Sequence, residues 1–147
     1  MNPKIVLEKK SLNDVVKITK TIIEFDQSYD KKYFEDRIKS EKNLILVAYI
    51  DHLPVGYLVS YDRDKDGSFY CWMAGVDPKF RQLGVLTELM KHLFQWAKNH
   101  NYLKIKIKTR NNRREMLAFL VKFGFNFTEV EPRADINNNR IMLEKYL

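Results

Sequence analysis

The spacing of apolar residues along the chain predicts a buried strand followed by an amphipathic helix. Residues 69–76 are almost continuously apolar, as in a strand that is covered on both faces, although such a run is also compatible with a buried helix. Between Val85 and Ala97 the apolar residues recur at three- and four-residue intervals, which is typical of a helix that buries one face. The sequence therefore predicts a strand, a short loop and a helix that begins near Arg81.

A second amphipathic helix is predicted over residues 112–123. Asn112 is suited to its N-cap, with Glu115 three residues later, and Gly124 is suited to its C-terminal end. Its apolar stripe consists of Met116, Leu120 and Phe123. Lysines alternate with isoleucines in the segment before this helix, residues 104–109, and this alternation predicts a strand.

The remaining segments are consistent with one mixed sheet. Ser11 and Asp14 form a capping-box-like start to another helix, and residues 30–39 are expected to form a short one. Asp66 and Gly67 are a strong hairpin signal before the apolar strand. Further strands are expected over residues 5–9, 44–50, 55–61, 126–131 and 140–146. The pattern predicts an α/β fold with about seven strands and about four helices.

Composition adds that this is one ordinary globular domain. The 147 residues are 45% apolar and 31% charged, and no repeat, low-complexity tract or linker divides them, so we expect a single domain over residues 1–147. No apolar run approaches membrane-spanning length, and the first residues lack the apolar segment of a signal peptide. We therefore expect a cytoplasmic protein without membrane contact.

The cysteine and histidine content argues against thiol and metal chemistry. Cys71 is the single cysteine, so no intramolecular disulfide can form. It lies in the apolar strand, without a nearby base or positive charge in the sequence to activate a thiolate, and we interpret it as a core residue rather than a nucleophile. His52, His92 and His100 share no metal-ligand spacing, so no metal site is expected.

The formal net charge of +7 raises the question of an anionic partner. The densest basic stretch comprises Lys104, Lys106, Lys108, Arg110, Arg113 and Arg114. Its alternation places the three lysines on one face of a strand. Three interpretations remain, namely a solvated face, electrostatic capture of a polyanionic ligand, and a nucleic-acid surface. We rank nucleic acid last, because the stretch has no recognised binding motif and no interleaved aromatic residues.

The loop between the apolar strand and the long helix has the chemistry of a phosphate site. The first turn of a helix offers backbone N–H groups without intrahelical partners and the positive end of the helix dipole. Gly84 lets a ligand approach the backbone, and Arg81 adds a guanidinium that can fork onto phosphate oxygens. A purely structural explanation remains open, in which Pro78 starts the helix, Arg81 is solvated and Gly84 serves packing.

Two motifs together resemble the GNAT superfamily of N-acetyltransferases. Residues 76–86 are similar to the family pattern Val-x-Pro-x-x-Arg-x-x-Gly-x-Gly/Ala before the long helix. The segment Lys122-Phe-Gly124-Phe125 is similar to the end of the family's next helix. The resemblance covers essentially the whole chain. It implies a single-domain GNAT-like mixed sheet flanked by helices, and an acyltransferase that uses acetyl-CoA.

The resemblance also implies where acetyl-CoA binds. The pyrophosphate would lie on the backbone of residues 81–87, and the pantetheine arm would run along the strand that ends at Val76. Asn112 would be the polar residue near the arm, although the family's asparagine aligns with Arg113 and a simple N-cap role explains Asn112 at least as well. The implied cofactor-binding residues are Ala74, Val76, Arg81, Gln82, Leu83, Gly84, Val85, Leu86, Thr87 and Asn112.

The chain departs from the family where the resemblance would place catalytic groups. The usual glutamate before the phosphate loop corresponds to Trp72 and Met73, and the usual tyrosine near the Gly-Phe pair corresponds to Leu120. Leu86 replaces the last small residue of the glycine pattern and falls on the apolar stripe of the helix. Three acidic residues could replace the missing base, namely Glu24, Asp26 and Asp30. The alternative is that they simply form a solvated helix end. Candidates for acceptor contact or core packing are Tyr29, Tyr33 and Tyr70. The catalytic residues thus remain unknown.

The sequence therefore predicts an N-acetyltransferase that passes an acetyl group directly from acetyl-CoA to a primary amine, on a small molecule or a peptide. The main alternative is a non-catalytic acyl-CoA-binding module, because the usual acid and base are missing. A basic nucleic-acid-binding protein ranks third. The sequence leaves open the identity of the amine, the nature of the acyl group and whether the chain forms a homodimer.

Overall fold

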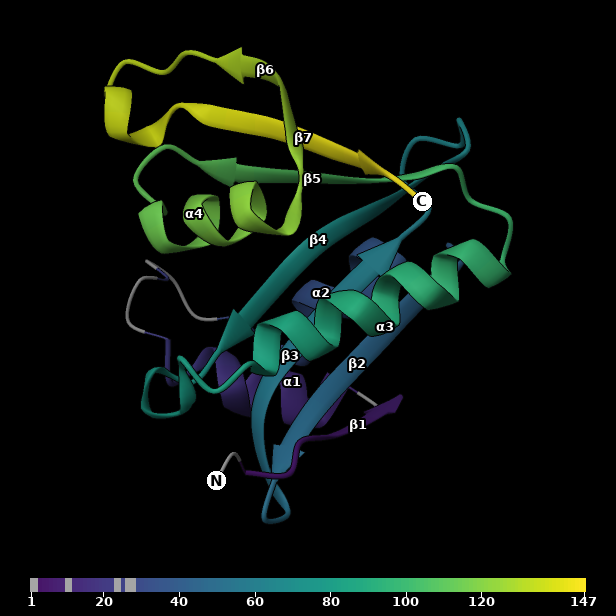
Figure 1. Cartoon of the computed structure of the whole chain (residues 1–147), viewed down its shortest axis with the longest axis vertical. Helices are drawn as coiled ribbons and strands as arrows, with labels where there is room; N and C mark the ends of the chain where they lie inside the picture. Colours follow the sequence, from purple (N-terminus) through teal and green to yellow (C-terminus); the bar gives the residue numbers. More distant parts are fainter. Residues whose placement is uncertain (1–2, 10–11, 23–24, 26–28) are drawn as a thin grey trace.

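The computed structural model describes residues 3–9, 12–22, 25 and 29–147. Over these residues seven strands form one sheet that four helices flank, which confirms the expected α/β fold (Figure 1). No helix in this part of the chain is long and apolar enough to cross a membrane. The elements are β1 (Val6–Lys9), α1 (Leu12–Thr19), α2 (Lys31–Ile38), β2 (Asn43–Ile50), β3 (Leu53–Tyr61), β4 (Ser68–Val76), the 3₁₀ turn η1 (Pro78–Phe80), α3 (Val85–Asn99), β5 (Lys104–Arg110), α4 (Arg114–Phe123), β6 (Asn126–Glu131), the 3₁₀ turn η2 (Ile136–Asn138) and β7 (Arg140–Tyr146).

One junction of the sheet differs from the others. The strand order is β1-β2-β3-β4-β5-β7-β6, and the neighbours are antiparallel except for β4 and β5. These two parallel strands pair only from Ser68 to Cys71, opposite Lys104 to Ile107. By contrast, β4 stays paired with β3 as far as Val76. The second half of β4 therefore diverges from β5, and the sheet opens between them (Figure 1).

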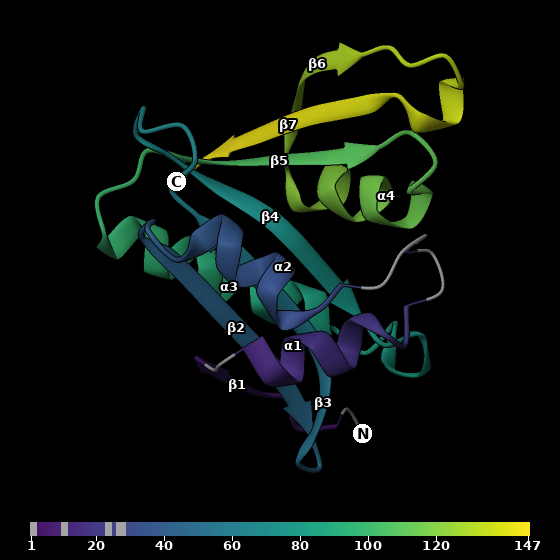
Figure 2. The ribbon, with the colours of Figure 1, turned by 180° about the vertical axis from the view of Figure 1, so that it is seen from behind.

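The sheet separates two hydrophobic cores. On one face α3 and α4 pack against the sheet, and Leu89, Leu93 and Leu120 are fully buried there. On the other face, seen in Figure 2, α1 and α2 cover the strands of the N-terminal half, and Phe34 and Tyr57 are fully buried beneath them. Because both faces of β4 are covered along most of its length, its near-continuous apolar sequence is explained.

The expected start of the long helix is wrong by about one turn. The helix begins at Val85 rather than near Arg81, because Gln82 and Gly84 have positive φ angles of 68° and 86°, a conformation that a right-handed helix cannot continue. A separate 3₁₀ turn, η1, precedes this break. The capping box expected at Ser11 lies outside the described residues.

The N-cap assigned to Asn112 is also wrong. Arg113 takes that position, and it makes no side-chain capping hydrogen bond. The main-chain N–H of Asn112 instead donates to the carbonyl oxygen of Asn137 at 3.1 Å. Asn112 thus belongs to the loop between β5 and α4, which is tied to the turn before β7.

The apolar stripe of α4 differs from its predicted position. Leu117 and Leu120 are buried, whereas Met116 and Phe123 are only partly buried at the edge of the core. The helix ends as predicted at Gly124, whose φ of 107° is left-handed and therefore suits glycine.

Each lysine of β5 forms an ion pair with a carboxylate. The pairs are Lys104–Glu144 at 2.9 Å, Lys106–Asp66 at 2.8 Å and Lys108–Glu131 at 3.1 Å. Hydrogen bonds from Lys106 and Ser68 hold the pKa of the Asp66 carboxyl below its usual range, so the acidic hairpin is tied to β5 rather than merely solvated. This pairing leaves the lysines less able to neutralise the phosphates of a nucleic acid.

Candidate functional site

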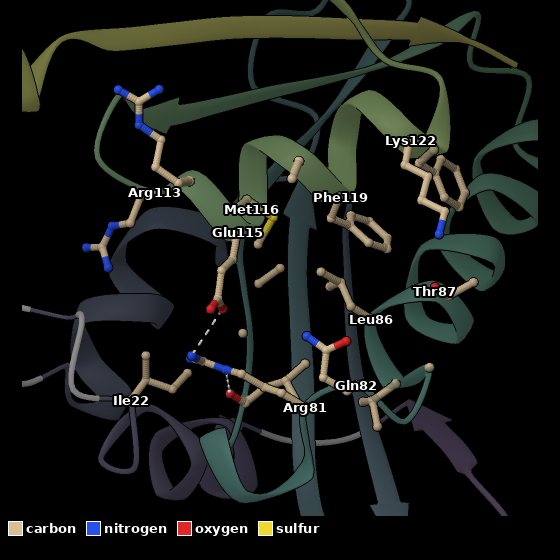
Figure 3. Close-up of a pocket in the computed structure, with 18 of the residues that line it drawn as sticks. Ile22, Arg81, Gln82, Leu86, Thr87, Arg113, Glu115, Met116, Phe119 and Lys122 are labelled. Carbon is tan, nitrogen blue, oxygen red and sulfur yellow. Dashed lines mark hydrogen bonds and ion pairs between the residues drawn. The ribbon is translucent and has the colours of Figure 1, made fainter. Parts of the chain in front are cut away.

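A cleft of about 980 Å³ lies between the end of β4, the start of α3 and the exposed side of α4 (Figure 3). Ala74 and Val76 reach it from β4, residues 81–82 and 84–87 from the loop and first turn of α3, and Asn112 from the loop before α4. Of the residues that the sequence implicates in cofactor binding, only Leu83 does not line the cleft. Its side chain is partly buried against the core.

The N-terminus of α3 faces the cleft without a side-chain cap. Its N-cap is Gly84, and the first main-chain hydrogen bond of the helix runs from the N–H of Glu88 to the carbonyl of Gly84 at 3.1 Å. The earlier N–H groups of the turn, from Val85 to Thr87, therefore have no intrahelical acceptor. Such a terminus is suited to bind an anion.

Gly84 is required by its backbone conformation and not by packing. A Cβ atom added there would have no heavy atom within 4 Å apart from its own chain neighbours, but the φ angle is 86°. The interpretation of Gly84 as a packing glycine is thereby wrong. The open space beside it also leaves room for a ligand to approach the main chain.

Arg81 ties together two sides of the cleft. Its Nε donates to the carbonyl oxygen of Val76 at 3.2 Å, and its Nη1 lies 3.6 Å from Oε2 of Glu115 on α4 (Figure 3). The side chain is 28% exposed. Arg81 is therefore not a simple solvated residue, since it fixes the end of β4 while its guanidinium remains at the cleft.

Positive charge predominates in the cleft. Among the described residues, one carboxylate lines it, that of Glu115. The cationic side chains that line it are Arg81, Lys91, Arg113, Arg114 and Lys122. This excess of positive charge favours a polyanionic ligand. Lys91 and Lys122 were missed in the sequence, because helical periodicity identifies exposed positions but not the cavity that they border.

An apolar wall of the cleft lies next to the charged loop. Leu86 on α3 and Met116 and Phe119 on α4 form it (Figure 3). Leu86, which was placed both on the apolar stripe of the helix and among the cofactor-binding residues, is partly buried against the core and also lines the cleft. An apolar wall next to an anion-binding turn suits an extended ligand with a charged end and a less polar arm.

A second cavity, of about 290 Å³, lies where β4 and β5 part, beside α2. Four residues line both cavities, namely Phe25, Ala74, Arg113 and Met116. The two cavities therefore meet at the opening of the sheet. At that opening, a ligand in the first cavity can contact a ligand in the second cavity.

Aromatic rings line the second cavity in a continuous chain. The ring centroids of Phe25 and Tyr29 are 5.4 Å apart, those of Tyr29 and Tyr33 4.8 Å, and those of Tyr33 and Trp72 5.5 Å. Burial raises the pKa of the Tyr70 hydroxyl, which also lines the cavity, to about 12. The Tyr70 phenol is therefore protonated at neutral pH and can donate a hydrogen bond.

The described residues include no obvious general base. Asp30 accepts a hydrogen bond from the main-chain N–H of Tyr33 at 2.8 Å, which is an N-cap role in α2. Trp72 and Met73 line the second cavity with apolar groups. Glu24 and Asp26 lie outside the described residues. Leu120 is fully buried in the core and lines neither cavity.

Cys71 borders the second cavity but is not prepared for nucleophilic attack. Burial raises the pKa of its thiol to about 12, so almost no thiolate exists at neutral pH. The structure thus agrees with the interpretation of Cys71 as a core residue. Within the described residues, no three His, Cys, Asp or Glu side chains are grouped so as to hold a metal ion.

The sequence matches the family described as "Acetyltransferase (GNAT) family" over residues 12–125. No curated protein matches the chain significantly.

Solved structures show the same fold over nearly the whole chain. Ard1 from Thermoplasma volcanium is 18% identical, with a TM-score of 0.80 over 97% of each chain. The ribosomal-protein-S18-alanine N-acetyltransferase from Escherichia coli is 14% identical, with a TM-score of 0.81 over 97% of this chain and 94% of the other. An Arabidopsis thaliana protein in complex with the bisubstrate analogue CoA-Ac-MVNAL is 21% identical, with a TM-score of 0.77 over 96% and 97%.

Proposed function

Because the chain belongs to the GNAT family of acetyltransferases, whose members transfer acetyl groups from acetyl-CoA, we propose that it acetylates a primary amine by direct transfer. The observation that carries this proposal is the meeting of the two cavities at the opening between β4 and β5. One cavity begins at an uncapped helix N-terminus and suits the donor, and the other is the place for an acceptor.

The donor would bind along the cleft. The main-chain N–H groups at the start of α3 would hold the pyrophosphate, as described for helix N-termini. Ala74 and Val76 on one side and Asn112 and Arg113 on the other would border the pantetheine arm. The cationic side chains of the cleft would attract the phosphates from solution.

Bound acetyl-CoA supplies a thioester whose carbonyl carbon an amine can attack. The chain's own part is to place that carbon at the meeting point of the cavities, beside Phe25 and Met116. The new C–N bond forms as the C–S bond breaks, CoA leaves as the thiolate, and the amine nitrogen passes a proton to water. A thiol with a pKa of about 8.5 is a tolerable leaving group without an acid, which is consistent with Leu120 at the position of the family's tyrosine.

Direct transfer is supported by the state of Cys71. Its buried thiol has a pKa raised to about 12, so an acyl-enzyme on this residue would require a nucleophile that is scarcely ionised. The acceptor is proposed to be a small molecule or a peptide. One structural neighbour is a ribosomal-protein-alanine N-acetyltransferase by name, and another holds a CoA–peptide analogue, and both suggest amine acceptors.

The alternative is an acyl-CoA-binding module without catalysis. It is favoured by the apolar residues at Trp72, Met73 and Leu120, where resemblance to the family would place an acid and a base. The two functions differ in one observable, the appearance of acetylated amine.

The test is a panel of primary amines and short peptides incubated with acetyl-CoA, with products identified by mass spectrometry. Matched alcohols in the panel separate N-acetylation from O-acetylation. We expect at least one N-acetylated product above the enzyme-free reaction, and its loss in Gly84→Glu. Binding of acetyl-CoA without any acetylated product would favour the non-catalytic module.

A further inference from the structure

We propose that the guanidinium of Arg113 stabilises the CoA thiolate as it leaves, a part that resemblance to the family would give to a tyrosine at the position of Leu120. The inference rests on the proposed function, because it assigns a catalytic residue to the same transfer. It is carried by the place of Arg113 where the two cavities meet, by the contacts of its side chain and by the chemistry of its neighbours.

Of the described residues that line both cavities, Arg113 alone has a polar side chain. The others are Phe25, Ala74 and Met116, which carry no charge and no N–H or O–H donor in their side chains. The proposed transfer takes place where the two cavities meet. Within the described part of the chain, the side chain at that point that can bind negative charge is therefore Arg113.

The main chain of Arg113 is fixed, whereas its side chain has no part in building the helix. Arg113 is the N-cap residue of α4 (Figure 3), and its side chain makes no capping hydrogen bond. Its main-chain N–H donates to the carbonyl oxygen of Arg110 at 3.0 Å, and its carbonyl oxygen accepts from the N–H of Leu117 at 3.0 Å. A substitution of the side chain should therefore leave the fold intact.

The guanidinium of Arg113 reaches from α4 toward β4, across the opening of the sheet. Its Cζ lies 5.4 Å from the ring centre of Phe25, which is a cation–π distance. Burial raises the pKa of the Tyr57 hydroxyl well above its usual range, and the positive charge of Arg113 partly counters this rise. Tyr57 itself lies against β4, since a Cβ atom added to Gly75 would come 3.1 Å from its Cε1 and 3.7 Å from Cζ of Phe25. The cation is thus held beside the end of β4.

The N–H donors of this guanidinium are available to a ligand. Its contact with Phe25 is made through the face of a ring, and among the described residues no hydrogen bond or ion pair occupies its donors. An arginine keeps its charge in proteins and presents its donors in a planar fork. A group that gains negative charge at this point can therefore be met by both charge and hydrogen bonds.

The course of the reaction shows where negative charge develops. The lone pair of the amine nitrogen forms the C–N bond, the electrons of the C–S bond pass to sulfur, and the nitrogen gives its proton to water. Negative charge grows on the carbonyl oxygen of the thioester and then on the sulfur. A fixed cation stabilises this charge more than the neutral thioester. Arg113 transfers no proton, but it lowers the pKa of the leaving thiol, so that the thiolate leaves without an acid.

A titration of bound CoA tests this inference without turnover. The protein is saturated with CoA, and the thiolate is followed by its ultraviolet absorbance as the pH is raised, with the complex of S-methyl-CoA as the blank. We expect the thiol pKa of bound CoA to be at least about one pH unit lower in the wild type than in Arg113→Gln, because an opposite charge within about 4–6 Å shifts a pKa by about 1–3. Cys71 and Tyr70 do not disturb the titration, since burial raises both of their pKa values to about 12.

Two further variants show whether the effect belongs to Arg113. Arg114→Gln is the matched control, because Arg114 is the next residue, is exposed and lines the first cavity but not the second. Its bound CoA should titrate as in the wild type, since salt screens a more distant exposed charge. Arg113→Lys should keep part of the lowered thiol pKa, because lysine keeps the charge but not the planar fork.

Three results of this titration would overturn the inference. The first is an equal thiol pKa in the wild type and in Arg113→Gln, with CoA bound to both. The second is an equal rise of the thiol pKa in Arg114→Gln, which would show a general field of the cleft. The third is the loss of CoA binding in Arg113→Gln that melting curves show to be folded, which would assign Arg113 to affinity.

Kinetics separate this inference from the proposed function. With the protein saturated with acetyl-CoA, Arg113→Gln should lower the single-turnover rate of acetyl transfer at least about tenfold, as for the loss of one positioned group. Its Kd for acetyl-CoA should stay within about threefold of the wild type, because the contact strengthens only as charge develops. An unchanged rate would refute the inference and leave the proposed function intact. A thiol pKa that depends on Arg113, with no amine acetylated, would support the place of the cation beside the sulfur and contradict the transferase.

Discussion

Nη1 of Arg81 lies 3.6 Å from Oε2 of Glu115, across the mouth of the cleft between β4 and α4 (Figure 3). The Glu115 side chain is 80% exposed, so this ion pair is expected to contribute little. The stronger anchor of Arg81 is its hydrogen bond to the carbonyl of Val76 at 3.2 Å. Arg81 therefore has a structural role at the end of β4 in addition to the phosphate contact proposed for it.

The first prediction separates these two roles of Arg81. Arg81→Ala should lower the unfolding free energy of the ligand-free protein by about 0.5–1.5 kcal/mol for the lost hydrogen bond, and it should also weaken CoA binding. Glu115→Gln, the matched control, should change stability by less than about 1 kcal/mol and leave CoA bound. Denaturant titration and calorimetry measure the two effects. Unchanged ligand-free stability in Arg81→Ala would show that the Val76 contact contributes nothing.

The second prediction concerns Gly84. Gly84→Glu places a carboxylate where the pyrophosphate is proposed to bind, so acetyl-CoA should no longer raise the melting temperature of the protein. Gly84→Asn should retain most of the stabilisation, because asparagine tolerates the left-handed φ of 86° better than most residues and has open space there. Thermal shift against acetyl-CoA concentration measures both variants, since a specific ligand stabilises in proportion to its occupancy. Equal stabilisation of the Glu variant would place the phosphates elsewhere.

The third prediction concerns Leu120, which is fully buried and borders neither cavity. Leu120→Ala should destabilise the fold by about 2–5 kcal/mol through a cavity, while the turnover of the folded protein changes little. Leu120→Tyr should overpack the core and cost about 1–3 kcal/mol without raising the rate. Turnover is measured well below the melting temperature of each variant. A large loss of rate in folded Leu120→Ala, with CoA binding intact, would assign Leu120 a catalytic role.

The fourth prediction is a pH dependence that comes from Cys71. Burial raises the pKa of its thiol to about 12 in the fold, whereas an unfolded cysteine titrates near about 8.5. As pH rises between these values, the unfolded chain loses the proton first, so the thiol's contribution to stability is full below about 8.5 and declines above it. The Cys71→Ala variant has no thiol, so its stability lacks this pH-dependent contribution.

The stability difference between the wild type and Cys71→Ala, measured by urea titration from pH 7 to pH 10, should therefore shift in favour of the variant as pH rises. The variant should also keep acyl transfer, because the proposed mechanism uses no acyl-enzyme. A difference that does not change with pH would indicate an accessible thiol of ordinary pKa. Loss of transfer in the folded variant would contradict direct transfer.

Most of the fold could be predicted because its signals are local. The strands over 126–131 and 140–146 were predicted with the bounds that the structure has, since alternation and flanking turn residues mark them. Helix starts were less predictable. The break before Val85 depends on the positive φ of Gln82, a residue type that gives no sign of this conformation in the sequence.

The first cleft was more predictable than the second cavity. The loop from Arg81 to Thr87 is continuous in sequence, so a short motif could indicate it, and most of its residues line the cleft. The second cavity combines Tyr33 of α2, Trp72 of β4, Arg110 of β5 and Arg140 of β7, four elements that the pairing of the strands and the packing of α2 bring together. Arg140 in particular carries no signal in the sequence, because its place beside Arg110 comes from the register of β7 with β5.

The central claim is acetyl transfer from acetyl-CoA to an amine, and the stoichiometry of the reaction tests it most directly. Released CoA thiol and N-acetylated amine are quantified in the same reaction, with the best acceptor of the amine panel and with no amine. The account predicts one thiol for each acetylated amine, and almost no thiol without amine. No acetylated amine, or thiol release that does not depend on amine, would contradict it.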